Sequence, residues 1–281
     1  MKAFIFAAGY GTRNLPITKS VPKELFPLYN KTALDFILEE CAEAGIYELV
    51  ILTSSRKVLL ENYFDRDVEL EISLTESNKI KELNLLHYTD QFKVSFIHQQ
   101  EMKGTGHALI SAGFLLDKEP FVAFFPDDIV LHTPGGALQV LNLYKETRCS
   151  VLGAREEYHN ISAYGVIESI EKNNVCYVTK IVEKPKADEA KSNLVSVGRF
   201  VYTPEFMDAL KTEYMSHKQG EFYPMGAMMQ MAKAEKLVVK KLLGQVLDTG
   251  NQDSYLNAIL EYAYTTIEGK KIIDSFINRL S

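Results

Sequence analysis

The stretch FIFAAGYGTRNLPITKSVPKELFPL, from Phe4 to Leu28, begins as an apolar strand and turns abruptly into a loop of glycines, prolines and cations. A dinucleotide-binding loop would read G-x-G-x-x-G, but no third glycine follows Gly9 and Gly11. A P-loop would place four residues between its glycines and then a lysine, which is also absent. The loop therefore matches neither of the two common phosphate-binding fingerprints.

The residue types of this loop nevertheless suit an anionic ligand. Glycines let the backbone approach a ligand closely, with N–H groups facing anionic oxygens. Arg13 offers a planar fork of donors that suits phosphate, and Lys23 offers a mobile point charge. Lys19 is either a third phosphate contact or a solvated flank. Pro16 and Pro22 predict an extended path for the lysine-bearing segment. On these residues alone, a tight turn with solvated cations remains open as an interpretation.

Strand-like and helix-like segments alternate through the first half of the chain. Apolar strands are predicted at residues 2–8, 48–54, 93–99 and 120–128. Helices are predicted at residues 32–45, 56–64 and 105–116, with Thr32 as an N-cap and Gly45 as a C-cap. Alternation of this kind predicts an α/β fold, with a mainly parallel sheet covered by helices on both faces.

The second half of the chain has a more mixed pattern. Strands are predicted at residues 150–155, 164–170, 175–184 and 196–202, and a further strand ends at Asp248. Helices are predicted at residues 204–214, 223–236 and 254–267. No repeat or low-complexity linker separates the halves. We therefore expect one α/β domain over residues 1–281, with a Rossmann-like mixed, mainly parallel sheet flanked by helices.

The composition is that of an ordinary folded protein, with 46% hydrophobic and 24% charged residues in a chain of 281. The formal net charge of −6 gives no overall attraction to nucleic acid. No apolar run approaches the roughly 18 residues that span a membrane, and residues 1–9 indicate a strand, not a signal peptide. Three widely spaced cysteines are typical of buried thiols in a reducing compartment. We therefore expect a cytoplasmic protein that binds neither nucleic acid nor membrane.

The full string AAGYGTRNLPITKSVPKE is far more specific than its glycines. It resembles the signature of sugar-1-phosphate nucleotidylyltransferases, most closely the bacterial UDP-glucose pyrophosphorylase branch, where the pattern runs A-A-G-x-G-T-R-x-L-P-x-T-K-x-x-P-K-E. Every fixed position is present here. The resemblance covers about residues 2–262 and implies the nucleotide-diphospho-sugar transferase type of fold. It implies a nucleotide-binding half at about 1–130, a sugar-binding half at about 131–262, and C-terminal helices at about 251–281.

The resemblance implies that the first half binds UTP. The segment HQQEMKGTGHAL, from His98 to Leu109, matches the family's Q-x-x-x-x-G-x-G-H-A, and by that match Gln99 reads the base. An amide both donates and accepts, so it can meet the O4 and N3–H edge of uracil, whereas cytosine lacks the N3–H. His107 is interpreted as a structural residue at the start of a helix. The implied nucleotide-binding residues are Ala7, Ala8, Gly9, Gly11, Thr12, Arg13, Gln99, Gly104 and Gly106.

Two aspartates end predicted strands, Asp127 in FFPDDIV and Asp248 in VLDTGNQDSYL. Ligands gather at the carboxyl ends of strands in open α/β sheets. A hard ion such as Mg²⁺ takes carboxylate oxygens and usually keeps waters and substrate phosphates as further ligands. The resemblance makes Asp127 and Asp248 the Mg²⁺ ligands. Without it, each would more simply be a helix N-cap or a turn residue.

The resemblance places the sugar in the second half. It assigns Gly165 of YGVIES and Gly198 of SVGRFVY to the sugar pocket. It assigns Glu183 of IVEKPK to the sugar hydroxyls and Lys184 to the sugar phosphate. A carboxylate can accept from two adjacent hydroxyls and an ammonium can meet the phosphate. Without the resemblance, Glu183 and Lys184 would more simply be a solvated charge pair.

The implied reaction joins UTP and glucose 1-phosphate into UDP-glucose and pyrophosphate. The attacking phosphate is already an anion, so neither a Ser, Cys or His nucleophile nor a general base is required. The chemistry needs two repelling anions held in place and the transition-state charge stabilised. The implied catalytic residues are Arg13 and Lys23, which hold the triphosphate and the departing pyrophosphate, and Lys184, which holds the attacking phosphate.

One segment departs from the family pattern. The stretch GEFYPMGAMM, from Gly220 to Met229, replaces G-E-[IV]-Q-L-T-D-[AS], so Met225 and Gly226 stand where threonine and aspartate are usual. The stretch LDTGNQDSYL is closer to the thymidylyltransferase branch. The same chemistry with dTTP or another sugar 1-phosphate therefore remains an alternative, and a non-catalytic sugar-nucleotide-binding relative is a second one. The family also implies a homo-oligomer, either a dimer or a tetramer.

Overall fold

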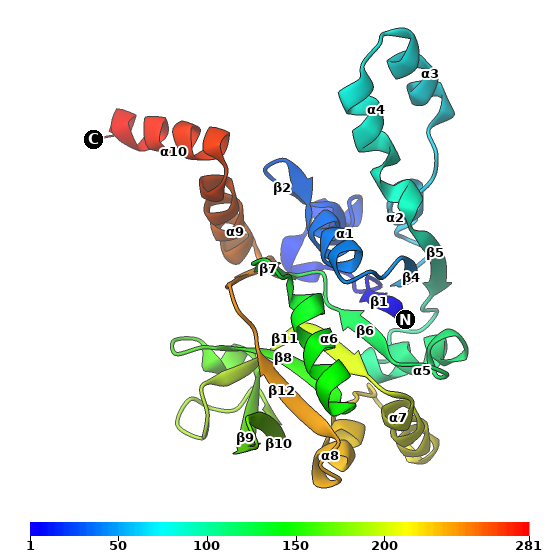
Figure 1. Cartoon of the computed structure of the whole chain (residues 1–281), viewed down its shortest axis with the longest axis vertical. Coiled ribbons are helices and arrows are strands. Elements are labelled where there is room, and N and C mark those ends of the chain that lie inside the picture. The colour runs from blue at the N-terminus through cyan, green and yellow to red at the C-terminus, as the bar shows by residue number, and fades with distance from the viewer. Residues whose placement is uncertain (281) are drawn as a thin grey trace.

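The protein is built around one sheet of nine strands, which the computed structural model describes together with the rest of residues 1–280 (Figure 1). The strand order is β5-β4-β1-β6-β11-β8-β12-β10-β9. In that order the strands are Lys93–His98, Glu48–Thr53, Lys2–Phe6, Phe121–Phe124, Leu194–Tyr202, Ser150–Glu156, Leu237–Lys241, Val175–Glu183 and Gly165–Lys172. Because β6 of the first half pairs with β11 of the second, both halves share the same sheet.

The direction of the strands changes along this sheet. The neighbours β5, β4, β1 and β6 are all parallel. Strand β11 then runs antiparallel to both β6 and β8, β8 and β12 are parallel, and β10 is antiparallel to β12 and β9. The predicted mixed α/β sheet is confirmed, and its continuous parallel part lies in the first half of the chain.

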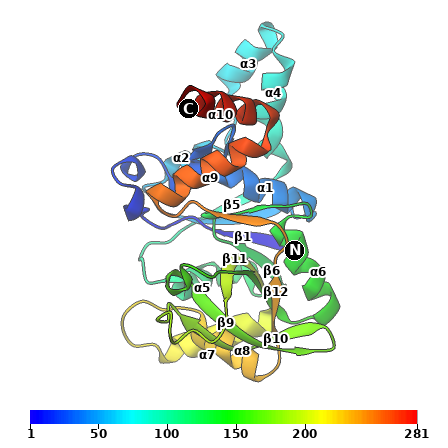
Figure 2. The ribbon, with the colours of Figure 1, turned by 90° about the vertical axis from the view of Figure 1, so that its left-hand side faces the viewer.

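Helices cover both faces of the sheet (Figures 1 and 2). The helices are α1 Ala33–Glu43, α2 Val58–Asn62, α3 Val68–Glu76, α4 Ile80–Leu86, α5 Thr105–Leu116, α6 Gly136–Thr147, α7 Pro204–Ser216, α8 Met225–Lys233, α9 Gln252–Thr265 and α10 Ile267–Leu280. Phe4 of β1 packs in the core with α5, α7 and α8, whereas Ala3 and Ile5 pack in the core with α1 and α6. Both faces of β1 are buried, which explains its unbroken apolar sequence.

The predicted helix signals agree with the helices α1 and α5. The Thr32 hydroxyl accepts from the backbone N–H of Asp35 at 3.2 Å, and the Asp35 carboxylate accepts from the Thr32 N–H at 2.7 Å. These two bonds form a capping box at the start of α1. Gly45 follows the end of α1 with φ of 70°. Helix α5 has the predicted bounds, 105–116.

Three helices, α3, α4 and α6, were not predicted from the sequence. Helices α3 and α4 contain no buried residue. No buried apolar face therefore marks them as helices in the sequence. With α10, they project from the same end of the molecule (Figures 1 and 2). None of the helices within residues 1–280 is both long and apolar enough to cross a membrane.

A two-stranded antiparallel ribbon stands apart from the main sheet. It pairs β7, Asp128–Leu131, with β13, Gln245–Asp248, so that Asp128 lies opposite Asp248. The strand predicted to end at Asp248 is thus β13. Residues 242–244 separate it from β12, which belongs to the large sheet. A second short ribbon pairs β2, Pro27–Leu28, with β3, Lys31–Thr32.

Candidate active site

The glycine loop leaves the carboxyl end of β1 and turns at Gly11. Gly11 has φ of 65°, in the left-handed region that favours glycine. A Cβ on Gly11 would lie 2.9 Å from Cγ2 of Thr18, whose hydroxyl donates to the Gly11 carbonyl at 2.9 Å. The loop therefore folds back against Thr18, and a larger residue at position 11 would open it.

The segment after the glycine loop corrects one prediction. We expected the prolines to hold it extended, but it forms three short 3₁₀ helices, η1 Thr12–Asn14, η2 Ile17–Lys19 and η3 Lys23–Leu25. Pro16 and Pro22 directly precede η2 and η3. The fixed φ of proline suits the first position of such a turn as well as an extended chain. Lys19 is exposed at the end of η2.

A cavity of about 400 Å³ opens beside the glycine loop. Eight predicted site residues line it: Ala8, Gly9, Gly11, Thr12, Lys23, Gln99, Gly104 and Asp127. Ala7 is buried behind it, only 1% exposed. Gly106 lies in the first turn of α5, where its N–H donates to the Phe222 carbonyl at 2.9 Å. The cavity thus unites six of the nine residues predicted to bind nucleotide with Lys23 and one predicted metal ligand, whereas Arg13 lies outside its lining.

Gln99 follows β5 and is 8% exposed in the wall of this cavity. Its amide nitrogen donates to the Gly104 carbonyl at 3.4 Å, a long bond. That bond uses one of the two amide N–H groups, so a second donor and the amide oxygen stay available to a ligand.

Lys23 and Asp127 form an ion pair in the cavity, with 2.8 Å between Nζ and Oδ2. Burial disfavours the charge of Lys23, but the surrounding carboxylates, Asp127 foremost and then Glu24, together outweigh this and raise the pKa of Lys23. Burial would likewise raise the pKa of Asp127, but the Lys23 ammonium lowers it below its ordinary value. Both side chains are therefore charged at neutral pH.

Asp127 and Asp248 converge where the β7–β13 ribbon ends. The Thr249 N–H donates to the Asp127 carbonyl at 2.8 Å, which ties the two loops together. A Cβ on Gly250 would lie 2.9 Å from Oδ1 of Asp248, 3.5 Å from Oδ2 of Asp127 and 3.5 Å from a guanidinium nitrogen of Arg13. Two carboxylates and one guanidinium therefore face the space that Gly250 leaves open.

The donor set around Gly250 fits a hard cation with exchangeable ligands. Within residues 1–280, no three His, Cys, Asp or Glu side chains come together as a ready metal site. Two carboxylates alone match Mg²⁺, which keeps waters and phosphate oxygens as its remaining ligands. The residues present are thus compatible with the predicted ion and leave coordination positions for a substrate.

Asp128 has a structural environment that the sequence did not reveal. Its Oδ2 accepts from the Gly198 N–H at 2.6 Å. Burial, followed by the charge of Asp127, raises the pKa of Asp128 to about 6. A Cβ on Gly198 would lie 2.5 Å from Cβ of Phe125 and 2.9 Å from the Asp128 carboxylate. In this structure Gly198 therefore packs behind the turn that carries Asp127 and Asp128, and it does not line the cavity.

The other residues predicted to bind the sugar, Gly165, Glu183 and Lys184, lie at β9 and β10, outside the cavity lining. The Lys184 ammonium is 3.9 Å from the Glu183 carboxylate, and both side chains are more than half exposed. Lys184 has φ of 45°, which is uncommon for a residue with a side chain. Its N–H donates to the Tyr164 carbonyl at 3.0 Å. Beside them, a Cβ on Gly165 would lie 3.1 Å from the Glu183 carboxylate.

Tyr164 contacts both Asp248 and the backbone of Lys184. Its hydroxyl lies 3.5 Å from Oδ2 of Asp248, while its carbonyl holds Lys184 as described. The guanidinium of Arg155 lies 4.9 Å from the centre of its ring. Tyr164 thus contacts the carboxylate of Asp248 through its hydroxyl and the backbone of Lys184 through its carbonyl.

The sequence model of nucleotidyl transferases matches this chain over residues 2–265. The chain belongs to the nucleotidyl transferase family. A relative from Staphylococcus haemolyticus, named UTP–glucose-1-phosphate uridylyltransferase, is 36% identical over 285 residues, which cover 99% of this chain and 98% of the relative.

Two solved nucleotidyl transferases have the same fold. A UTP-bound UDP-glucose pyrophosphorylase from Acinetobacter baumannii is 28% identical, with a TM-score of 0.89 over 100% of this chain and 99% of that one. A UDP-glucose pyrophosphorylase complexed with UDP-glucose is 32% identical, with a TM-score of 0.81 over 95% and 100%. The predicted family and its fold are thereby confirmed.

Several lining residues of this nucleotidyl transferase were missed by sequence reasoning: Phe6, Tyr10, Leu52, Met102, Thr105, Ala108, Phe125, Glu221 and Tyr223. The rings of Phe6 and Phe125 stack with centres 4.4 Å apart and form part of its wall. Glu221 and Tyr223 belong to the segment that departs from the family pattern. The Phe222 N–H donates to the Lys103 carbonyl at 2.7 Å and holds that segment against the loop before α5.

The rest of the segment that departs from the family pattern, from Met225 to Met229, lies in α8, which packs against α7. A Cβ on Gly226 would overlap the Glu213 carboxylate of α7. The aspartate usual in the family would require the Glu213 side chain to move. Glycine at this position is therefore explained by the helix contact.

Restoring the family residue is expected to destabilise the fold. Gly226→Asp would displace the Glu213 side chain and place a second carboxylate beside it, lowering the free energy of unfolding by about 1–3 kcal/mol. Urea unfolding measures this change. In a Glu213→Ala background the same substitution should cost less, and an equal cost in both backgrounds would contradict the steric explanation.

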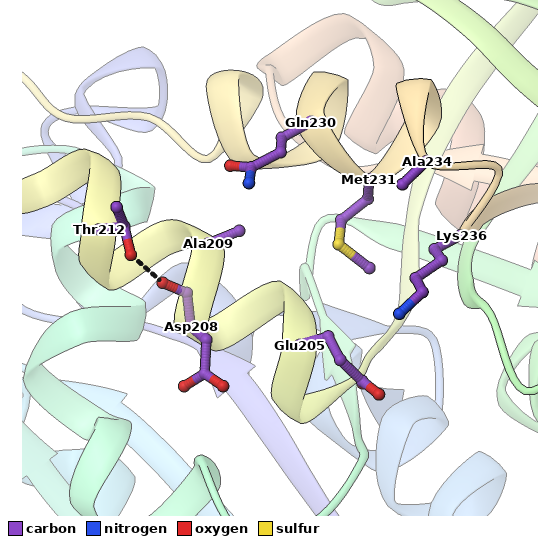
Figure 3. Close-up of a pocket in the computed structure, with 8 residues that line it drawn as sticks. All are labelled: Glu205, Asp208, Ala209, Thr212, Gln230, Met231, Ala234 and Lys236. Carbon is purple, nitrogen blue, oxygen red and sulfur yellow. Dashed lines mark hydrogen bonds between the residues drawn. The ribbon is translucent and has the colours of Figure 1, made fainter.

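A second hollow, of about 380 Å³, lies between α7 and α8 (Figure 3). It is lined by Glu205, Asp208, Ala209, Thr212, Gln230, Met231, Ala234 and Lys236. The Thr212 hydroxyl donates to the Asp208 carbonyl at 2.8 Å, a bond within α7. No predicted site residue lines this hollow, whereas eight line the cavity beside the glycine loop, which is therefore the candidate active site.

Proposed function

We propose that this chain transfers a uridylyl group from UTP to glucose 1-phosphate and releases pyrophosphate. The observation that carries the proposal is the convergence of Arg13, Lys23, Asp127 and Asp248 beside a cavity walled by Gln99. Cations that hold a triphosphate and carboxylates that hold a divalent ion are the parts that phosphoryl-group chemistry requires. The names of the Staphylococcus relative and of the two solved neighbours support the choice of UTP and glucose.

The cavity receives the nucleotide. The Gln99 oxygen accepts from the uracil N3–H and its spare N–H donates to O4. The loop from Ala8 to Thr12 passes along the nucleotide, and its backbone N–H groups face the phosphates. Arg13 and Lys23 hold the β- and γ-phosphates and retain them as pyrophosphate when the α-phosphorus is attacked.

Asp127 and Asp248 hold Mg²⁺ in this proposal. The bound ion would draw charge from the phosphate oxygens and align them. Glu183 accepts from sugar hydroxyls, and Lys184 holds the phosphate of glucose 1-phosphate so that its oxygen faces the α-phosphorus. No residue needs to accept a proton, because the attacking phosphate is already ionised.

A substrate matrix tests the proposal. The purified chain is incubated with each of UTP, dTTP, ATP and GTP, and with glucose, galactose or N-acetylglucosamine 1-phosphate, with Mg²⁺ or with EDTA. Pyrophosphate release and the sugar nucleotide are measured by chromatography. UTP with glucose 1-phosphate and Mg²⁺ should give the highest rate. A higher rate with dTTP would establish the alternative substrate, and UDP-glucose binding without turnover would establish the non-catalytic one.

Gln99→Leu should weaken use of UTP selectively. The substitution keeps the volume but removes both hydrogen bonds to the base, at about 1–3 kcal/mol, which is a roughly 5- to 150-fold loss in kcat/KM. Steady-state kinetics with varied UTP measure this effect. Gln100→Leu is the matched control, because Gln100 is the next residue and is exposed. Equal effects of the two substitutions would contradict the role of Gln99.

We also infer a homo-oligomer in the cytoplasm, where UTP is made and used. Helix α10 packs against α9 and exposes large apolar side chains, among them Ile267, Ile272, Phe276 and Leu280. A helix of this length is marginal in water without further packing. A second copy of the chain would cover that face and give a dimer or a tetramer. Light scattering after size-exclusion chromatography measures the mass, and a monomer at every concentration would refute the inference.

A further inference from the structure

We propose that Lys57 is a positioning residue for Lys23 and acts on it through Glu24. The Lys57 ammonium lies 2.9 Å from each carboxylate oxygen of Glu24. The Glu24 side chain is 0% exposed and that of Lys57 is 10% exposed. Among the described residues 1–280, Lys57 is the only residue that forms an ion pair with Glu24. The inference rests on the proposed role of Lys23 in phosphate binding.

The ion pair joins two segments at the carboxyl edge of the sheet. Glu24 lies in η3, next to Lys23, while Lys57 follows β4 and begins α2. The Lys57 N–H donates to the Ser54 carbonyl at 2.9 Å, which fixes its backbone in the turn after β4. Strand β4 is the parallel neighbour of β1. Lys57 therefore anchors the lysine-bearing segment to the sheet that also carries the glycine loop.

Charges of alternating sign extend from Lys57 into the cavity. Lys57 pairs with Glu24, and Lys23, the neighbour of Glu24, pairs with Asp127 at 2.8 Å. Burial, only partly opposed by Glu24, lowers the pKa of Lys57. Glu24 contributes to the raised pKa of Lys23, so the two groups interact electrostatically. Glu24 thus interacts with two ammonium groups, but its hydrogen bonds go to Lys57.

Removing Lys57 would change the position of the Lys23 ammonium. A buried carboxylate that loses its partner is strongly unfavourable and must find another cation. The nearest candidate in the sequence is the ammonium of Lys23, which would then leave Asp127 and the phosphate position. By neutralising Glu24, Lys57 keeps Lys23 directed into the cavity.

The same turn also supports the glycine loop. Arg56, next to Lys57, lies with its guanidinium 5.6 Å from the ring centre of Tyr10. Tyr10 stands between the two glycines and lines the cavity. Two consecutive cations after β4 therefore contact the glycine loop and the lysine-bearing segment, the two pieces of chain that we assign to the triphosphate.

Lys57→Met should weaken binding of pyrophosphate and UTP by about 10- to 100-fold, the effect typical of losing an outer partner of a site residue. The KM for glucose 1-phosphate should change little, because Lys184 and Glu183 lie on another part of the sheet. Adding Glu24→Gln should restore most of the lost binding, since no carboxylate remains to attract Lys23. A purely stabilising ion pair would produce neither the selectivity nor the rescue.

The experiment measures pyrophosphate binding by calorimetry for the wild type, Lys57→Met, Lys57→Met/Glu24→Gln, and the control Lys211→Met. Lys211 also forms an ion pair, with Asp117 at 2.6 Å, on α7 away from the glycine loop. Wild-type binding by Lys57→Met, or a double variant as weak as the single one, would overturn the proposal. If Lys57→Met does not fold, Lys57→Gln keeps a hydrogen-bond donor and must show the same selective loss.

These results separate the inference from the proposed function. A wild-type chain that binds pyrophosphate without forming UDP-glucose would defeat the proposed reaction, while the comparison of variants would still decide the role of Lys57. A wild-type chain that turns over normally, with Lys57→Met equally active at low UTP, would defeat only the role of Lys57.

Discussion

Asp127→Ala is expected to reduce the rate of UDP-glucose formation at least about 10³-fold, which corresponds to about 4 kcal/mol of transition-state stabilisation. The substitution removes one of the two carboxylates that face Gly250 and also the partner of Lys23. Lys23 would remain in the cavity without the charge that now orients it. The rate is measured under saturating UTP, glucose 1-phosphate and Mg²⁺.

The loss should be catalytic and not structural. Circular dichroism and urea unfolding should show a folded Asp127→Ala chain, because Asp127 is only partly buried and the alanine leaves no unpaired charge except that of Lys23. Asp127→Asn, which preserves the shape, should be nearly as inactive. Asp117→Ala removes a carboxylate that pairs with Lys211 far from the cavity and should retain activity. Normal turnover by Asp127→Ala would refute the assigned metal ligand.

Arg199→Met should produce the largest loss of stability, about 3–5 kcal/mol in the free energy of unfolding. Arg199 is fully buried and donates twice to Glu40, at 2.8 and 3.0 Å. Its remaining N–H groups donate to the carbonyls of Phe125, Gly198 and Asp128 at 2.8–3.3 Å. Methionine would remove the charged partner of Glu40, which would keep the Ala137 N–H, and would take one donor from each of these carbonyls. Urea unfolding of the purified chain measures the change.

A double substitution separates charge from packing in this case. Arg199→Met with Glu40→Leu removes both charges, and an apolar pair of similar volume can be as stable as a buried ion pair. The double variant should therefore recover part of the stability lost by the single one. Its activity should stay low, because the carbonyls of Phe125 and Asp128 flank the turn that carries Asp127. A single variant as stable as the wild type would contradict the importance of this network.

Individual strands and helix ends could be predicted because neighbouring residues in the sequence determine them. Residues 2–6 form a strand buried on both faces and are therefore uniformly apolar. Thr32 and Asp35 specify the start of α1 by their own hydrogen bonds. Helices α3 and α4 could not be found this way, because no buried stripe marks them. The prolines gave a wrong prediction, because their φ suits both 3₁₀ turns and extended chain.

Residues of the candidate site could be predicted only where they belong to one continuous sequence motif. The segment from Ala7 to Lys23 and the segment from Gln99 to Gly106 both contribute residues to one cavity. The family resemblance implied this, because it assigns both segments to nucleotide binding. Contacts between distant charges were not predictable, since Glu24–Lys57 and Glu40–Arg199 look like solvated residues in the sequence. Glu40 did carry a signal: it follows Phe36 and Ile37 by one helical turn and so shares their buried face.

The β7–β13 ribbon has a consequence for the synthesis of the chain. Thr249 of the Asp248 loop bonds to Asp127 across 122 residues. At about 5–20 residues per second, the ribosome adds this stretch in roughly 6 to 25 seconds, and chains fold from the N-terminal end meanwhile. During that interval the nascent protein has its glycine loop and Asp127 but lacks the second carboxylate. We therefore expect a translation product interrupted before β13 to be unable to transfer a nucleotidyl group, however well its first half has folded.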